Sequence, residues 1–256
     1  GKELSQFVLS TANKDMSLKT KAADLALDSF ERIENYEELT AKAKQFAGVL
    51  PKRKTTYLGI SRRAAVNQSV QLSKNKNSDD VKKSIAVLAA APMTGATQDE
   101  KLQVDLNMLQ LATRDLDLTR VEESANRIIV NKVATTKDKK LAKVKLLWVY
   151  ETRFQFLSAL NLVKNSPELF GKKEEALLKI AVLTELADLP SEQAYRRYIM
   201  ATRDVKKANL IRLKLIKTSS HPWQALARDS KSLLKTPELF AEALLEAYAK
   251  SKNTKY

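Results

Sequence analysis

The sequence contains no cysteine, one histidine and only five glycines among 256 residues. Without cysteine there is no disulfide, thiolate nucleophile or cysteine zinc site, and one histidine cannot form a polyhistidine metal site. Glycine makes up about 2% of the chain against an average of about 7%, which argues against phosphate-binding loops, hairpin turns and doubly wound sheets. We therefore expect no metal site, no cofactor and no catalytic residue, and the composition favours helices.

Long hydrophobic runs are also absent. A membrane span needs about 18 uninterrupted apolar residues, but even the stretch 141–162 contains Lys143, Lys145, Glu151 and Arg153. No transmembrane segment is predicted. Gly1 is typical of a cleavage scar, so the native leader and compartment are hidden. The absence of cysteine suits a bacterial envelope as well as a cytoplasm, and we slightly favour the periplasm or envelope.

Apolar residues recur at helical spacing along most of the chain, and no convincing strand is present. Residues 17–33 illustrate the pattern, with one predicted buried stripe formed by Leu18, Ala22, Leu25, Ala26, Phe30 and Ile33. Twelve helices are predicted in all, over 17–33, 36–50, 57–72, 80–91, 98–113, 119–133, 137–163, 173–189, 192–202, 205–217, 223–234 and 237–249.

One capping motif occurs twice. Ser166-Pro167-Glu168-Leu169-Phe170 returns as Thr236-Pro237-Glu238-Leu239-Phe240, and the two copies are displaced by 70 residues. A hydroxyl N-cap, proline at the first helical position and an acid in the first turn predict a helix start at both places. Since 70 residues is close to two periods of about 34, the recurrence favours a repeat of helical hairpins.

Residues 178–201 resemble a tetratricopeptide repeat. Ala194, Tyr198 and Ala201 match the small–aromatic–small pattern of its second helix, and Leu178 and Ala181 match packing positions of its first. A weaker copy comprises Ala23, Ala26, Phe30, Leu39, Ala43, Phe46 and Pro51. The usual glycine and tryptophan are missing. The resemblance implies a degenerate, right-handed α-solenoid of stacked hairpins. We expect one helical-repeat domain over 1–256, as a fragment of a longer bacterial protein, with sub-arrays 1–136 and 137–256.

Positive charge is concentrated in the second sub-array. Residues 137–256 hold 24 basic and 13 acidic side chains of a chain with formal net charge +15, whereas residues 1–136 are near neutral. The densest part is 196–217, where eight cations accompany one acid, Asp204. Such asymmetry indicates either a solvated face or a surface that attracts an acidic partner.

The sequence therefore predicts a non-enzymatic scaffold. The groove of a helical repeat binds segments of other proteins, and a basic groove favours an acidic peptide or domain. We expect the contacts to come from the densest basic stretch, with one aromatic anchor: Tyr195, Arg196, Arg197, Arg203, Lys206, Lys207, Arg212 and Lys214. Oligomeric state and partner identity are not encoded in any pattern that we can identify.

Two alternatives stay open. The same cations could contact nucleic-acid phosphates, although no polar set recurs once per repeat and the aromatics follow core spacing. The chain could also belong to a cell-wall-acting enzyme as its solenoid, catalytic or not. Glu151 is then the acid to test because it lies among Trp148, Tyr150 and Phe154. His221, beside Pro222, is expected at a helix start rather than in a catalytic site.

Overall fold

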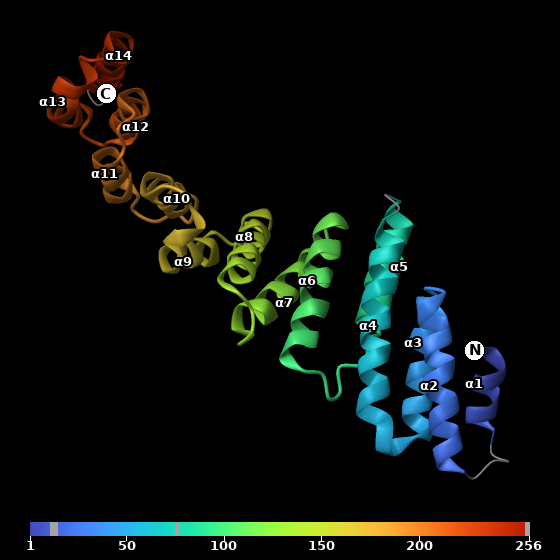
Figure 1. Ribbon diagram of the computed structural model, residues 1–256. Coiled ribbons are helices and arrows are strands. Elements are labelled where there is room, and N and C mark those ends of the chain that lie inside the picture. Colours follow the sequence, from blue (N-terminus) through green and yellow to red (C-terminus); the bar gives the residue numbers. More distant parts are fainter. Residues whose placement is uncertain (11–14, 75–76, 254–256) are drawn as a thin grey trace. The chain divides into compact units, whose positions relative to one another are not determined.

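The computed structural model describes residues 1–10, 15–74 and 77–253. In this part of the chain there are fourteen α helices, two 3-10 turns (Pro51–Arg53 and Pro167–Leu169) and no strand (Figure 1). The all-α prediction is therefore confirmed for these residues. The helices are α1 (Lys2–Leu9), α2 (Met16–Arg32), α3 (Tyr36–Val49), α4 (Lys54–Ser73), α5 (Ser78–Ala89), α6 (Gln98–Arg114), α7 (Leu118–Val130), α8 (Thr136–Thr152), α9 (Phe156–Asn165), α10 (Lys173–Leu186), α11 (Glu192–Ala201), α12 (Val205–Thr218), α13 (Pro222–Leu233) and α14 (Pro237–Asn253).

The chain divides into two compact units, unit 1 (Gly1–Val149) and unit 2 (Tyr150–Tyr256). Within unit 1, contacts join consecutive helices from α1 to α7, with further contacts between α1 and α3 and between α4 and α6. Within unit 2, consecutive helices from α9 to α14 are in contact, and α12 also contacts α14. Packing against the next helix in sequence is what stacked hairpins require. The single-domain organisation stays a prediction.

Four of the helix–helix turns share one backbone conformation. Glu34, Leu116, Phe154 and Asp188 all have φ between 53° and 57°, the left-handed region. The residue after each of them donates its N–H to the carbonyl five residues earlier, at distances of 2.8 to 3.0 Å, as in a Schellman motif. The positions 116, 154 and 188 are 38 and 34 residues apart. A recurring turn at this spacing is consistent with a helical repeat.

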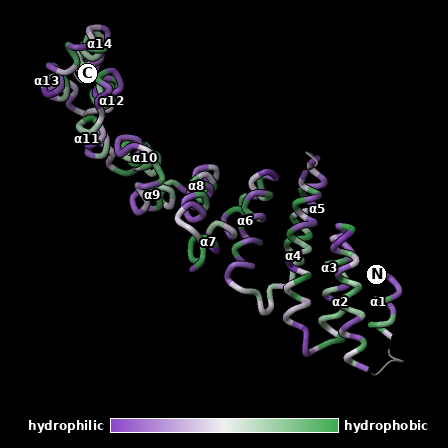
Figure 2. The backbone as a smooth tube through the Cα atoms, viewed as in Figure 1, coloured by the Kyte–Doolittle hydropathy of each residue, from purple (hydrophilic) through white to green (hydrophobic). Residues whose placement is uncertain are grey.

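The helices are amphipathic, and Figure 2 shows hydrophobic and hydrophilic residues alternating along them. In unit 1, Ala26 and Phe30 of α2 pack with Phe46 of α3 and Tyr57 of α4. The rings of Phe46 and Tyr57 meet edge to face with centroids 6.2 Å apart. The predicted stripe on α2 is partly wrong: Ala22, Ala26 and Phe30 are buried, but Leu18, Leu25 and Ile33 are exposed. The buried face is instead centred on the alanines, which allow close helix approach, and is completed by Ala23 and Leu27.

Two expected helix boundaries are also wrong. The predicted helix 137–163 is broken between α8 and α9, because Phe154 adopts the left-handed conformation that ends α8. The predicted helix start at Ser166 is only a 3-10 turn. Phe170 has an extended backbone, which ends the turn, and the next helix begins at Lys173. Its counterpart at Thr236 does begin α14, as expected.

Fourteen helices are observed in the described residues where twelve were expected, because the predicted helix 137–163 is two helices, α8 and α9, and because α1 was not predicted. Helix α1 has only eight residues, too few for its apolar period to be recognised.

Candidate partner-binding surface

The eight predicted contact residues all lie in unit 2, on α11, on α12 and in the turn between them. The structure separates them into two groups. Four take part in polar contacts among the helices of unit 2: Tyr195, Arg196, Arg212 and Lys214. The other four have exposed side chains: Arg197, Arg203, Lys206 and Lys207.

Tyr195 lies in the core rather than at an open surface. Its side chain is 1% exposed and packs with Ala181 and Leu215. Its hydroxyl donates a 2.5 Å hydrogen bond to Oε2 of Glu185. Nζ of Lys214 also donates to this carboxylate, contacts the Tyr195 oxygen at 3.0 Å and lies 4.8 Å from the ring centroid. These contacts connect α10, α11 and α12.

The Tyr195 contacts shift three ionisations in consistent directions. Hydrogen bonds from Lys214 and Tyr195 hold the pKa of Glu185 below its ordinary value. Burial raises the pKa of the Tyr195 phenol, and the bond to Glu185 raises it further. Burial alone would lower the pKa of Lys214, but the bonds to Glu185 and Tyr195 raise it. The cluster is therefore stable as a neutral phenol between a carboxylate and an ammonium group.

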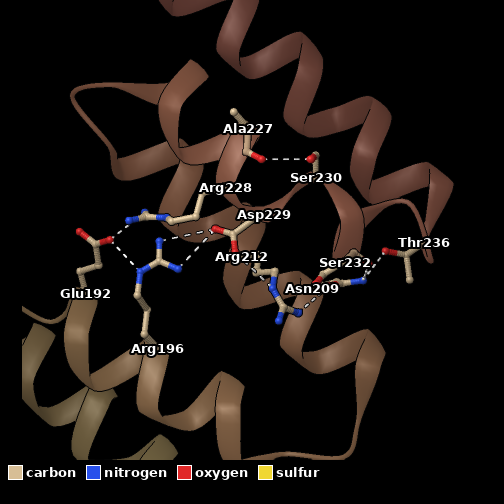
Figure 3. Close-up of polar contacts among 10 residues, drawn as sticks. All are labelled: Glu192, Arg196, Asn209, Arg212, Ala227, Arg228, Asp229, Ser230, Ser232 and Thr236. Atoms are coloured by element: carbon tan, nitrogen blue, oxygen red, sulfur yellow. Dashed lines mark hydrogen bonds and ion pairs between the residues drawn. The ribbon is translucent and has the colours of Figure 1, made fainter.

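Arg196 points toward α13, where Figure 3 shows it between two acids. Its Nε donates to Oε1 of Glu192 at 2.9 Å, and both terminal nitrogens lie 3.5 Å from Oδ2 of Asp229. Arg228 also donates to Glu192, at 3.0 Å. Asp229 is 8% exposed, so it needs a cation beside it. The guanidinium of Arg196 thus compensates a nearly buried carboxylate.

Arg212 reaches the same carboxylate from α12. Its Nε lies 3.4 Å from Oδ1 of Asp229, and one terminal nitrogen donates to Oδ1 of Asn209 at 2.8 Å. Asn209, fully buried, donates in turn to the carbonyl of Ser232 at 2.8 Å and to Oγ1 of Thr236 at 2.9 Å (Figure 3). This network joins α11, α12 and α13 to Thr236, the residue before α14.

Two of the four exposed residues, Arg203 and Lys207, line a hollow of about 710 Å³ at one end of α10, α11 and α12. Its cations come from the starts of α10 and α12 and from the turn before α12: Lys172, Lys173, Arg203 and Lys207. Glu174, Glu175 and Asp204 also line it, over a floor that includes Leu178 and Tyr198. Arg197 is one helical turn before Ala201, another lining residue. We call this region the basic hollow.

Few of these cations are neutralised within the chain. Lys207 lies 3.5 Å from Oδ2 of Asp204, the N-cap of α12, whose pKa is lowered by the backbone N–H of Lys207. In the part of the chain that the structure describes, the following have no ion-pair partner: Lys172, Lys173, Arg197, Arg203 and Lys206. The hollow therefore offers cations that a partner could contact without first breaking an internal pair.

Sequence reasoning missed Lys172 and Lys173. Their only signal is their position, because Lys172 is the N-cap and Lys173 the first residue of α10. Lys206 and Lys207 occupy the first turn of α12 in the same way. Cations near a helix N-terminus oppose the helix dipole, at a cost of roughly 0.3–1 kcal/mol each. Both lysine pairs thus stand where local helix chemistry disfavours them.

The structure also places the two residues considered for catalysis, Glu151 and His221. Glu151 forms an ion pair with Lys179 of α10. His221 is the exposed N-cap residue of α13, makes no side-chain capping bond and donates its backbone N–H to Ser219. Over residues 1–10, 15–74 and 77–253, no group of three potential metal-ligating side chains comes together.

No described helix is both long and apolar enough to cross a membrane. No family model matches the chain, and no match is found among curated proteins or solved structures.

Proposed function

We propose that this protein is a non-enzymatic interaction module whose basic hollow binds an acidic segment of another protein. The observation that carries the proposal is the division of the cations of unit 2. Arg196 and Arg212 compensate the nearly buried Asp229, whereas Arg203 and Lys206 are exposed and unpaired among the described residues. Cations of the second kind can be neutralised by a partner.

The arrangement of the hollow suits a carboxylate-rich segment. Lys172 and Lys173 stand at the start of α10, and Lys207 stands in the first turn of α12. Asp204 already caps the first turn of α12, whereas the start of α10 has no side-chain cap. The lysines and the first turn of α10 therefore attract the same negatively charged ligand. Binding through exposed charges is steered electrostatically and weakens as salt screens the interaction.

For the architecture, we infer a degenerate tetratricopeptide-like repeat whose hairpins stack into a right-handed solenoid. The support is the left-handed turn that recurs at Leu116, Phe154 and Asp188, at spacings close to one repeat. The buried pattern Ala23, Ala26 and Phe30 adds to it, as does the buried Tyr198, whereas Ala201 of the same pattern is exposed. Stacked repeats of this kind form extended concave surfaces that bind partners.

A charge-reversal experiment tests the proposal. Fluorescent poly-L-glutamate is titrated with the protein at about 50 and about 200 mM salt, a range over which contacts to charged polymers weaken strongly. We expect Arg203→Glu with Lys207→Glu to reduce affinity by about tenfold, which corresponds to roughly 1.4 kcal/mol. The matched control reverses two exposed lysines outside the hollow, Lys231 and Lys235. Equal losses in both double variants would mean that only net charge matters.

A single-stranded oligonucleotide of matched charge tests the nucleic-acid alternative. Base stacking needs exposed aromatic rings, but the one aromatic residue that lines the hollow in the described part of the chain, Tyr198, is buried. We therefore expect weaker, more salt-sensitive binding than to poly-L-glutamate. Tighter oligonucleotide binding would replace the acidic peptide with a nucleic acid as the partner.

The cell-wall enzyme alternative makes a separate prediction at Glu151. If Glu151 were a catalytic acid, Glu151→Gln would abolish activity on peptidoglycan without lowering stability. Because Glu151 is paired with Lys179, we expect instead that the substitution slightly changes stability and nothing else.

A further inference from the structure

Unit 1 contains a second cavity, of about 550 Å³, between α5, α6 and α7. Its floor is apolar and consists of the buried side chains of Leu88, Val104 and Met108. Met93 and Val130, which is 77% exposed, stand at its rim. A cavity of this volume, with an apolar floor and a few polar groups, is typical of a ligand site.

Two charged side chains of this pocket, Asp105 and Lys101, have hydrogen-bonding or charged atoms without a partner in the described chain. Asp105 is 5% exposed, and its Oδ1 accepts a 2.7 Å hydrogen bond from Nε of Arg127. Its Oδ2 accepts no hydrogen bond from the described residues and is not one of their solvent-excluded unpaired polar atoms, so a donor from a ligand can reach it. Lys101, one helical turn earlier on α6, also lines the pocket and has no ion-pair partner in the described chain.

We propose that this pocket binds an aromatic side chain of a partner peptide, with an adjacent backbone N–H on Asp105 and an adjacent carboxylate near Lys101. Two thioethers, those of Met93 and Met108, line the pocket, and methionine sulfur makes favourable contacts with aromatic rings. The charged lining comprises Lys101, Arg127 and Asp105, so the pocket is formally cationic and favours an acid over an amine.

This site is independent of the basic hollow. The hollow is formed by residues of unit 2, whereas all residues of this pocket belong to unit 1. Either site could therefore exist without the other, and variants of one leave the other intact.

The four methionines provide a direct probe. Met93 and Met108 line the pocket, whereas Met16 and Met200 do not, so methyl-¹³C-methionine labelling gives two reporters and two internal controls. We titrate N-acetyl-L-phenylalanine, for which a fragment of this size predicts a Kd of about 1 mM. Saturable ring-current shifts of the Met93 and Met108 methyl signals alone are the expected result. No saturation by about 20 mM, or equal shifts of Met16 and Met200, would overturn the proposal.

Three related compounds test the carboxylate, N–H and ring contacts separately. N-acetyl-L-phenylalaninamide lacks the carboxylate, 3-phenylpropanoate lacks the N–H, and N-acetyl-L-alanine lacks the ring. Each is expected to bind more weakly than N-acetyl-L-phenylalanine. If the alanine derivative shifted the two methyl signals equally, the pocket would not be an aromatic site.

Two surface variants complete the test without disturbing the core. Lys101→Gln is expected to weaken binding of the acid about threefold, as for a partly exposed ion pair, and to leave the amide unaffected. Val130→Glu places a like charge at the rim and is expected to weaken the acid further, whereas Val144→Glu, on an exposed residue of α8 outside the pocket, is the control. Unchanged affinity in both pocket variants would contradict the proposal. Methyl shifts that change with protein concentration alone would assign the pocket to a second copy of the chain.

Discussion

The hydroxyl of Tyr195 donates a 2.5 Å hydrogen bond to Oε2 of Glu185, ten residues earlier on the neighbouring helix. Lys214 of α12 contacts both residues, so three helices of unit 2 share one polar cluster. An aromatic residue and a lysine that the sequence suggests as partner contacts are thus engaged inside the unit. The surface open to a partner is the neighbouring set of exposed cations.

Replacing Tyr195 with phenylalanine should destabilise the protein. The substitution keeps the buried ring but removes the hydroxyl that bonds to Glu185 and accepts from Lys214. We expect the free energy of unfolding of unit 2 to fall by about 1–2 kcal/mol, as for a hydrogen bond to a charged group. Urea unfolding followed by circular dichroism measures it. If stability were unchanged while poly-L-glutamate binding fell, Tyr195 would be a partner contact after all.

Glu185 should make stability depend on pH. Its folded-state pKa is lowered by Lys214 and Tyr195, so the unfolded state binds a proton more readily. The stabilisation is present above the ordinary glutamate pKa and is lost as the pH falls through the folded pKa. We expect Glu185→Gln to cost stability at pH 7 and progressively less on acidification. A cost independent of pH would show that the carboxylate charge does not matter.

Asn209 should be among the most sensitive polar positions. It is fully buried, donates to Ser232 and Thr236 and accepts from Arg212. Asn209→Ala leaves these partners unsatisfied, and we expect a loss of about 3 kcal/mol in unfolding free energy. The matched substitution at the exposed Asn161 on α9 should change stability by less than about 0.5 kcal/mol. Similar effects at both positions would contradict the network.

A glycine should stabilise the turn at Leu116. This residue has φ 57°, where a side chain costs roughly 1–2 kcal/mol, and it is 68% exposed, so little packing is lost. After the entropy cost of glycine, we expect Leu116→Gly to raise the unfolding free energy by about 0.5–1 kcal/mol. Thermal unfolding tests it against Gly95→Ala, which places a Cβ at φ 69° and should be destabilising. A destabilising Leu116→Gly would mean that the turn is not left-handed.

The helical class could be predicted because amphipathic periodicity depends only on local spacing. The break at Phe154 could not, since neither glycine nor proline marks it and the left-handed residue is a phenylalanine. Hydrophobicity alone also predicts the wrong buried face for α2. Leu18 and Leu25 are more hydrophobic than Ala23, but close helix packing selects the small side chain.

Sequence alone predicts the region of the candidate site but not which of its cations are exposed. Charge density located α11 and α12, yet Arg196 and Arg197 are adjacent in sequence and have different environments. Arg196 meets Asp229, 33 residues later, whereas Arg197 is exposed. Only the packing of α11 against neighbouring helices distinguishes an arginine that compensates a buried acid from one that is open to a partner.

Comparing three double variants tests most directly whether the paired cations of unit 2 stabilise the fold while the exposed cations bind the partner. Arg203→Gln with Lys207→Gln should reduce poly-L-glutamate affinity by about threefold, half the free-energy change of the charge reversal, and should not lower the urea midpoint. Arg196→Gln with Arg212→Gln should lower the midpoint, because Asp229 loses both cations, while the folded protein retains affinity within about twofold of the control. Lys231→Gln with Lys235→Gln is that control, because it removes the same charge elsewhere. The opposite pattern, with affinity lost only in the Arg196 and Arg212 variant and stability unchanged, would contradict the account.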